Sequence, residues 1–316
     1  MNNAAQDVIG YGWRVTVPAT SANLGCAFDC GALALKLYLK ANLIPKQSQN
    51  LTVQYAGRTP DRIPLDDSNL IVRAIRFVTD YFSAPHACGH IVVESQIPVG
   101  VGMGSSAAAV VAGLLLGTQY CGRQLSPEQL VQFAAEMEGH VDNAAAAYYG
   151  GLVLGLSSNS GRVTAVKTEF PEQIKLVVVT PSITVSTDHA RQALPSSYQR
   201  ADVVHTLQRT AVLAATCFSG RFDLFPELFD DRIHQPYRQQ LVPGIAACLG
   251  YRQEGLLGIA ISGSGSSVIA FVEKNERGIA DELQEIFSRA GVDAETLLTS
   301  ADNHGAAVTK ELVPTY

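Results

Sequence analysis

The sequence predicts an α+β protein of two domains, and three observations lead to this prediction. The chain has 316 residues, which is enough for about two domains of ordinary size. Segments with the patterns of strands and of helices follow one another along the whole chain. A stretch rich in serine and glycine at residues 157–161, and then Pro171, precede a new set of strands that starts at residues 175–180 (KLVVVT). We therefore expect an N-terminal domain at residues 1–170 and a C-terminal domain at residues 171–316.

The composition is that of a globular protein, with 47% hydrophobic and 16% charged residues. The formal net charge of −6 shows no basic excess, so we expect no nucleic-acid partner. No apolar run reaches the roughly twenty residues of a membrane span, and residues 1–10 lack a signal-peptide core. We therefore expect a cytoplasmic protein without a membrane partner. The six cysteines lack a paired metal-binding spacing and are expected to be free, buried thiols.

The first two strands flank a stretch of small residues. Residues 13–17 (WRVTV) alternate as a strand does, and residues 32–43 continue as an apolar strand. Residues 18–31 between them contain Asn23, Asp29 and two glycines. This composition suits a loop that approaches a ligand closely, and equally an ordinary turn in which Asn and Asp bond to the backbone.

A third strand is expected at residues 51–55, followed by a helix that begins at Asn69 and runs to Tyr81. Asn69 is equally compatible with a helix cap and with a ligand contact. Residues 90–95 (HIVVES) then form the strand that leads into a glycine-rich loop.

This glycine-rich loop is the main candidate for a functional site. Gly100, Gly102 and Gly104 alternate, Ser105 and Ser106 follow, and residues 107–117 continue as an apolar helix. Glycine leaves no side chain between the backbone and a ligand. The first turn of a helix adds unpaired N–H groups and the positive end of the helix dipole. Such a loop suits a phosphate chain.

Two familiar phosphate loops are excluded by their residues. A Walker loop needs a lysine that is missing here, and the glycine spacing is not that of a Rossmann fold. A cradle of backbone amides with a hydroxyl for a metal remains. A glycine turn before a buried helix is the structural alternative.

The next helix begins at Ser126 and Pro127 and directs an apolar face to the core. Its end is polar although apolar runs lie on both sides. The residues concerned are Glu136, Glu138, His140, Asp142 and Asn143. A solvated helix end would explain them, but a functional pocket explains the apolar surroundings as well.

The C-terminal domain is expected to hold a strand at residues 175–180 and helices at 187–191 and 205–218. Two strands surround the glycine and serine turn at residues 262–267. A helix at residues 278–290 and an edge strand at 306–308 end the chain.

Three separated segments together resemble the GHMP kinases, the family of galactokinase, homoserine kinase, mevalonate kinase and phosphomevalonate kinase. Residues 98–107 match its Pro-x-x-x-Gly-Leu-Gly-Ser-Ser-Ala loop, with Met103 in place of leucine. Residues 18–31 and 262–267 resemble its other two motifs. Ser266 stands where the last motif usually has proline, and Val101 stands where arginine or serine is common.

Within the family, the chain is most similar to the homoserine kinases. The segments that carry this similarity are residues 21–29 (SANLGCAFD), 138–145 (EGHVDNAA), 186–191 (STDHAR) and 236–238 (PYR). The resemblance implies an N-terminal domain like ribosomal protein S5, with a left-handed crossover, and a ferredoxin-like C-terminal domain. It also implies that ATP lies between the two domains, and it allows a homodimer.

The resemblance also assigns the nucleotide and metal positions. The expected nucleotide-binding residues are Asn69, Pro98, Gly100, Gly102, Met103, Gly104, Ser105, Ser106 and Ala107. Mg²⁺ would be bound by Ser106, or as second choice Ser105, together with Glu136. We expect Glu138 to point away, because it lies only two residues further along the same helix.

An amino-acid alcohol brings a carboxylate, an ammonium and a hydroxyl, and the chain offers a complement for each. Arg191 and Arg238 would clamp the carboxylate, and Asp29 would pair with the ammonium. The full expected set for the substrate is Asn23, Asp29, His140, Asn143, Thr187, Arg191 and Arg238. Asp142 and Asn143 are the catalytic candidates, with Asp142 as a general base or with catalysis by positioning alone.

The implied activity is ATP-dependent phosphorylation of the L-homoserine hydroxyl, giving O-phospho-L-homoserine for threonine biosynthesis. Two alternatives stay open. The chain could be a GHMP kinase for another small molecule, or a catalytically silent sensor of the same fold that binds ATP and a ligand.

Overall fold

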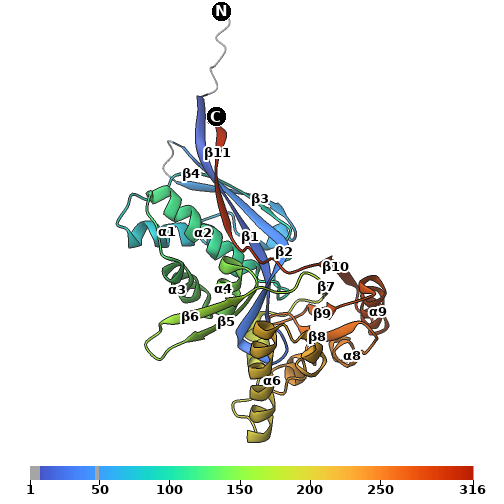
Figure 1. Ribbon diagram of the computed structural model, residues 1–316. Helices are drawn as coiled ribbons and strands as arrows, with labels where there is room; N and C mark the ends of the chain where they lie inside the picture. Colours follow the sequence, from blue (N-terminus) through green and yellow to red (C-terminus); the bar gives the residue numbers. More distant parts are fainter. Residues whose placement is uncertain (1–7, 47–49, 316) are drawn as a thin grey trace, which may run out of the picture.

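The computed structural model describes residues 8–46 and 50–315. Its larger sheet contains β1 (Val8–Asn23), β2 (Ala27–Pro45), β3 (Leu51–Gly57), β4 (Gly89–Ser95), β5 (Leu152–Ser157), β6 (Val163–Thr168) and β11 (Ala307–Thr315). The strand order is β11-β1-β2-β4-β3, while β5 pairs with β2 and with β6. Of the described pairs, β3 and β4 run parallel and the others antiparallel. In Figure 1, β3, β4 and β11 lie in the upper part of the molecule, and the β5–β6 hairpin lies at the lower left.

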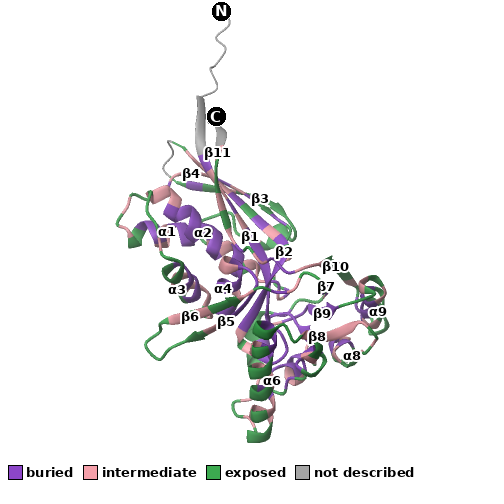
Figure 2. Ribbon diagram, viewed as in Figure 1, coloured by how far each residue is buried: buried purple, intermediate pink, exposed green. Residues whose placement is uncertain are grey.

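The helices of this half cover one side of the larger sheet. They are α1 (Leu70–Tyr81), α2 (Ser105–Cys121), α3 (Pro127–Glu138) and α4 (Asp142–Tyr149), with the short 3₁₀ helix η1 (Pro60–Arg62) ahead of α1. The alanine- and leucine-rich α2 contacts α1, α3, α4 and the first two strands. A helix that is apolar on all sides must be covered on all sides. Figure 2 accordingly shows α2 as largely buried, in the middle of its layer.

The smaller sheet has the ferredoxin-like order expected from the sequence. Its strands are β7 (Lys175–Pro181), β8 (Leu256–Ile261), β9 (Val268–Val272) and β10 (Ala294–Thr299). They are arranged as β10-β7-β9-β8, all antiparallel. The accompanying helices are α5 (Thr187–Gln192), α6 (Arg200–Ser219), η2 (Phe222–Glu227), α7 (Gln235–Arg238), α8 (Ile245–Gly250) and α9 (Glu276–Arg289).

The chain crosses between the sheets twice, once after β6 and once after β10. The expected boundary at residue 170 falls within residues 169–174, which connect β6 and β7, and residues 158–162 are the turn of the β5–β6 hairpin. β11, however, pairs with β1 over its whole length and so belongs to the first sheet. The open edge of β1 offers backbone groups that need partners, and the last strand of the chain supplies them.

The stretch at residues 18–31 is a buried hairpin tip, not an open loop. β1 continues to Asn23 and β2 starts at Ala27, so only three residues form the turn between them. Every residue from Val17 to Ala27 is buried. The tip therefore lies inside the molecule, where other segments can build on it.

Helix caps follow the expected residues. Asn69 accepts a hydrogen bond from the backbone N–H of Ile71. Ser126 and Gln129 form a reciprocal capping box at the start of α3, with Pro127 in the first turn. Each cap satisfies backbone groups that the helix itself leaves unpaired.

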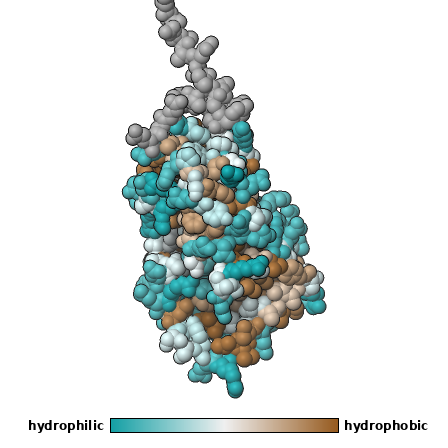
Figure 3. All heavy atoms as spheres, turned by 90° about the vertical axis from the view of Figure 1, so that its left-hand side faces the viewer, coloured by the Kyte–Doolittle hydropathy of each residue, from teal (hydrophilic) through white to brown (hydrophobic). Residues whose placement is uncertain are grey.

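The surface is mixed in character. The face in Figure 3 is mostly hydrophilic above, and hydrophobic side chains gather at its lower end, at the height of α6 in Figure 1. The exposed large hydrophobic residues of α6 are Val204, Leu207, Val212 and Phe218. Among the helices that the structure describes, none has the length and apolar surface that a membrane crossing requires. All six cysteines are free, and Cys26, Cys217 and Cys248 are buried.

The two glycines that flank α2 allow a test of how tightly the glycine loop is packed. Gly104 and Gly122 have φ values of 66° and 59°, so alanine strains the backbone at both. A Cβ atom at Gly104 would also overlap the hydroxyl of Thr20, whereas one at Gly122 would meet nothing within 4 Å. Gly122→Ala should lower the free energy of unfolding by about 1–2 kcal/mol. Gly104→Ala should cost about 1–3 kcal/mol more, because of overpacking. Urea unfolding measures both, and equal losses would contradict the close contact.

Candidate active site

A cavity of about 410 Å³ lies where the glycine loop, the β1–β2 hairpin tip and the smaller sheet meet. Most of the residues expected at the site from the sequence line it. They are Asn23, Asp29, Gly100, Gly102, Met103, Gly104, Ser105, Ser106, His140, Asp142, Asn143, Thr187, Arg191 and Arg238. Residues more than two hundred positions apart in the chain, such as Asn23 and Arg238, thus contribute to one site.

The glycine loop turns its carbonyl groups toward the protein. The carbonyl oxygens of Val101, Gly102 and Met103 accept hydrogen bonds from Ser267 N, Ser262 Oγ and Thr20 N. Within the described chain, no backbone N–H of residues 100–104 donates to a protein acceptor. The loop therefore presents free donors next to the start of α2, as an anion site requires.

Two loop residues are placed by close contacts with distant segments. A Cβ atom at Gly102 would overlap the carbonyl oxygen of Ser262, and one at Gly104 would overlap Thr20. Ser262 also donates from its hydroxyl to Gly102 O at 2.6 Å. Met103 is buried but lines the cavity, whereas Ala107 is buried and is not among the lining residues. Pro98 lies in a neighbouring cavity.

The carboxylate beside the loop is Glu138, so the expectation that Glu138 points away is wrong, and Glu136 does not reach Ser106. Ser106 Oγ donates to Glu138 Oε2 at 2.7 Å. Glu136 is exposed and accepts a hydrogen bond from Gln132 one turn earlier in α3. The cause is the rotation of α3. Val131 and Ala134 are buried, and Glu138 follows them by seven and four residues, so it lies on the same face.

Burial raises the pKa of Glu138, while the hydrogen bond from Ser106 and the charge of His140 counteract this in part. An ionised Glu138 is therefore costly in the ligand-free protein. A cation placed beside it would remove that cost.

The start of α4 forms a second polar group. His140 Nδ1 lies 2.8 Å from Asp142 Oδ1, and this hydrogen bond raises the pKa of His140. Asp142 also accepts from the backbone N–H of Asn143 at 2.6 Å. Asn143 Oδ1 in turn accepts from the Thr20 hydroxyl at 2.7 Å. Thr20 was not among the expected site residues, although it lies within the first motif.

Two arginines and one aspartate also line the cavity. Arg191 makes two hydrogen bonds to Asp29, of 3.0 and 3.2 Å, between the hairpin tip and α5. Arg238 has only 3% of its surface exposed, and its guanidinium donates to Ala190 O and Gly263 O. Its Nη2 has no partner within the described residues. A buried cation with a free donor beside a cavity is suited to an anionic group.

Two of the side chains expected to bind the substrate also make hydrogen bonds within the protein. The side chain of Asn23 donates to Gly263 O at 2.6 Å and accepts from Asp29 N at 2.9 Å. It therefore ties the hairpin tip to the β8–β9 turn and holds Asp29. Thr187 lies at the cavity wall, where its hydroxyl is 3.5 Å from that of Ser264.

Asn69 does not line the cavity, and its expected role in nucleotide binding is not supported by its geometry. Its Oδ1 caps α1, and its Nδ2 donates to Pro64 O at 2.7 Å. The residue is 4% exposed. Both polar atoms are thus used inside the protein, which leaves the helix-cap interpretation.

A second cavity of about 580 Å³ adjoins the first and shares Arg62, Val99 and Thr184 with it. Arg62 reaches Val99 O and the Thr184 hydroxyl, both at 3.5 Å, and so lies across the boundary of the two cavities. No motif marks this arginine in the sequence, and only the fold brings it to the site.

The described side chains supply only part of the coordination shell of Mg²⁺, so phosphates and water would supply the rest. In the described part of the chain, no group of three or more His, Cys, Asp or Glu side chains could hold a metal by itself. Ser106 and Glu138 offer two hard oxygen ligands, and the raised pKa of Glu138 shows a carboxylate that a cation would stabilise. Mg²⁺ commonly combines one or two protein ligands with phosphates and water.

Comparison with known proteins agrees with this geometry. The family models for the GHMP kinase N-terminal and C-terminal domains match residues 69–151 and 212–292. The chain is 36% identical to homoserine kinase from Solibacter usitatus over 298 residues, which are 94% of this chain and 97% of the relative.

Two solved structures have the same fold over nearly their full length. Homoserine kinase from Cytophaga hutchinsonii superposes with a TM-score of 0.84 at 25% identity, and the match covers 98% of this chain and 99% of that one. A putative homoserine kinase from Listeria monocytogenes has a TM-score of 0.74 at 30% identity, over 95% and 100% of the two chains. The chain therefore belongs to the GHMP kinases, and within them to the group of the homoserine kinases.

Proposed function

We propose that this protein transfers the γ-phosphoryl group of ATP to the hydroxyl of L-homoserine and forms O-phospho-L-homoserine. The observation that carries the proposal is the buried Arg238, which lines the same cavity as the glycine loop and whose Nη2 has no partner among the described residues. A carboxylate-binding group in the same cavity as a phosphate-binding loop favours an acceptor that is an amino acid. The similarity to homoserine kinases supports the same acceptor.

The ion pair between Arg191 and Asp29 provides recognition of a zwitterion. In the ligand-free protein, these two charges neutralise each other across the cavity mouth. A substrate with a carboxylate and an ammonium can replace both halves of the pair, with Arg191 and Arg238 on the carboxylate and Asp29 on the ammonium. Mevalonate has no ammonium and a neutral sugar has no charge, so each would leave part of this set unpaired.

The donor substrate would use the glycine loop and the two joined cavities. The free N–H groups of residues 100–106 would bind the phosphates, and Arg62 would add a positive charge beside them. The base would occupy the second cavity, near Pro98 and Val99. Mg²⁺, when bound by Ser106 and Glu138, would neutralise the charge that spreads over the transferred group.

For the acceptor hydroxyl, we favour positioning over general base catalysis. Asp142 Oδ1 accepts hydrogen bonds from His140 and from the backbone N–H of Asn143, so the carboxylate is held in place at the first turn of α4. Asn143 is held by Thr20 beside it. These residues would orient the hydroxyl for in-line attack, which can supply a large part of the rate.

A substrate panel tests the proposal. Release of ADP is measured with L-homoserine, mevalonate and galactose at equal concentrations. Homoserine should have the highest kcat/KM, and faster turnover of another alcohol would assign a different GHMP kinase activity. Tight binding of ATP and homoserine without turnover would instead identify a silent sensor. Threonine biosynthesis, a cytoplasmic location and a homodimer remain predictions.

A matched pair of variants can test whether Glu138 or Glu136 binds the metal. Glu138→Gln should lower kcat on the order of a hundredfold and change the Mg²⁺ dependence, because a metal clamp contributes several kcal/mol. Glu136→Gln should leave both unchanged, since its side chain is exposed. Steady-state kinetics at several Mg²⁺ concentrations measures this. Loss of activity in the Glu136 variant alone would restore the original assignment.

The same two variants are expected to differ in thermal stability. Because the pKa of Glu138 is raised, its stabilising contribution is complete below the ordinary pKa of 4.5 and is lost as the pH rises through the raised value. At neutral pH, Glu138→Gln should therefore raise the melting temperature of the ligand-free protein. Glu136→Gln should change the free energy of unfolding by no more than about 0.5 kcal/mol. Thermal unfolding without ligand checks both, and a lower melting temperature for the Glu138 variant would contradict the burial cost.

Arg238 and Arg191 should affect the acceptor and not ATP. Arg238→Ala should lower kcat/KM for homoserine roughly thirtyfold or more, because truncating a buried charged partner costs about 2–5 kcal/mol. Arg191 is exposed, so Arg191→Ala should cost less, about 1 kcal/mol or fivefold. KM for ATP should stay within about twofold for both, since other residues hold the phosphates.

Lysine at Arg238 should restore only part of the activity, because a point charge does not reproduce the guanidinium fork. Arg289→Ala on α9, which removes an exposed pair with Glu285, is the control and should have no effect. Near-normal homoserine kinetics in both cavity variants would show that the acceptor is held elsewhere.

A further inference from the structure

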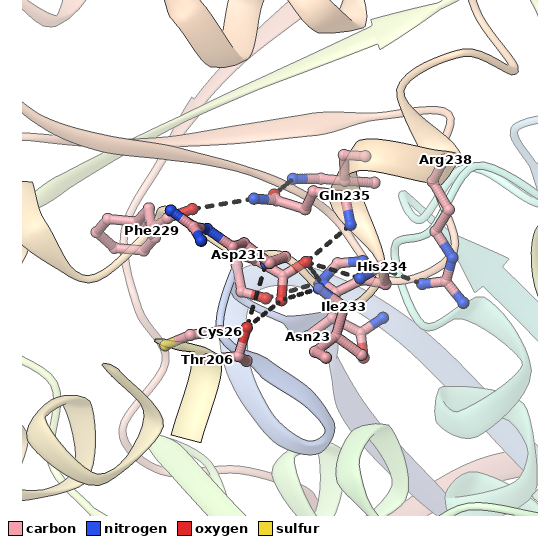
Figure 4. A network of polar contacts seen from close by, with 12 residues as sticks. Asn23, Cys26, Thr206, Phe229, Asp231, Ile233, His234, Gln235 and Arg238 are labelled. Carbon is pink, nitrogen blue, oxygen red and sulfur yellow. Dashed lines mark hydrogen bonds and ion pairs between the residues drawn. The ribbon is translucent and has the colours of Figure 1, made fainter. Parts of the chain in front are cut away.

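A buried polar network around Asp231 and His234 adjoins Arg238 (Figure 4), and neither Asp231 nor His234 lines the cavity. Asp231 is 4% exposed and accepts hydrogen bonds from the backbone N–H groups of Ile233, His234 and Gln235, at 3.0, 2.8 and 2.8 Å. The Thr206 hydroxyl of α6 adds a fourth contact at 3.3 Å. The carboxylate thus holds the start of α7 in place and ties it to α6.

His234 joins α7 to the hairpin tip. Its side chain is fully buried, and its Nε2 lies 2.7 Å from Gly25 O. A carbonyl oxygen can only accept, so Nε2 must carry the hydrogen. In the neutral ring, Nδ1 is then an acceptor, and it lies 3.5 Å from Arg238 Nη1.

Several charged groups surround His234, but burial has the largest effect on its pKa. Burial lowers the pKa of His234 to about 4, the charge of Asp231 raises it, and the charge of Arg238 lowers it. Asp29, on the hairpin, is the remaining charged group and raises it slightly. The ring is neutral at physiological pH, in agreement with an acceptor that faces an arginine.

Phe28 connects the histidine and the arginine a second time. Its ring is stacked on that of His234, with centroids 5.1 Å apart and an interplanar angle of 21°. The guanidinium carbon of Arg238 lies 5.1 Å from the centroid of the same ring. His234 and Arg238 are four residues apart, so both project from one side of α7 onto the hairpin.

We infer that His234 is a positioning residue for substrate recognition: it joins the hairpin tip to α7 and holds the Arg238 guanidinium in the direction in which Nη2 meets the substrate carboxylate. This inference rests on the proposed function. Without the histidine, Arg238 keeps its bonds to two carbonyl groups but loses the link that aligns it with Asp29 across the site. The shorter contact, from Nε2 to Gly25 O, is the main part of this link.

Three substitutions of His234 distinguish the contact of Nε2 with Gly25 O from the contact of Nδ1 with Arg238. In His234→Gln, the amide nitrogen can reach the place of Nε2 and donate to Gly25 O. In His234→Asn, the amide oxygen can take the place of Nδ1 and face Arg238, but no donor reaches Gly25. His234→Ala removes both contacts. Gln235→Ala is the matched control, because Gln235 is a buried neighbour on α7 whose side chain donates to Phe229 O and accepts from Ile261 N. Within the described structure it makes no hydrogen bond to Arg238.

The measurement is steady-state kinetics with homoserine and ATP, with thermal unfolding of every variant. We expect His234→Ala to raise KM for homoserine about tenfold, from loss of a buried hydrogen bond, with KM for ATP unchanged. His234→Gln should recover most of this and His234→Asn little. In an Arg238→Ala background, His234→Ala should have no further effect on KM for homoserine, because both act through one group. Gln235→Ala should lower stability without changing KM for homoserine.

Equal KM values for homoserine in the Ala, Gln and control variants, with the wild type active, would overturn the inference and leave the proposed function intact. A wild-type protein that does not use homoserine would overturn the proposed function. In that case, crystal structures of His234→Ala and Gln235→Ala still decide the positioning role. A guanidinium displaced from Phe28 only in His234→Ala supports it, and an unmoved guanidinium in that variant refutes it.

Discussion

The close packing of the glycine loop against two distant segments is the constraint on which the site depends. Gly102 touches the β8–β9 turn and Gly104 touches Thr20 of β1, both at distances that a Cβ atom could not occupy. This packing consumes the loop carbonyls and leaves the N–H groups free toward the cavity. It also brings both sheets together at the hairpin tip, so that one contact region sets the depth of the phosphate site and its distance from the acceptor.

The charges of the site are held in places where they are costly until a ligand arrives. Burial lowers the pKa of Arg238 and raises that of Glu138, so each charged form is disfavoured in the ligand-free protein. Backbone carbonyls and the ring of Phe28 compensate the arginine in part. The protein therefore gives up some stability for groups that are complementary to a carboxylate and to a metal-bound phosphate.

Local patterns predicted the elements well, and the errors have physical causes. The starts of α1 and α3 are set by Asn69 and Ser126, whose side chains satisfy nearby backbone groups. Glu138 was expected to point away from the loop, but it contacts Ser106, and the spacing along α3 explains why. Glu138 follows the buried Val131 by seven residues and so shares its face of α3. The role of Asn69 could be decided only from the structure, because a helix cap and a ligand contact use the same side-chain atoms.

By itself, the sequence determined the α+β class, the helix caps, the glycine loop and, through its motifs, the resemblance to the GHMP kinases. These features depend on residues close together in the chain, whose spacing and backbone chemistry can be read directly. Only the tertiary structure decided that β11 returns to the first sheet, that Arg62 and Thr20 reach the site, and that His234 adjoins Arg238. Each of these joins segments that are far apart in the chain, and their contacts follow from how the two sheets pack, which no local pattern records.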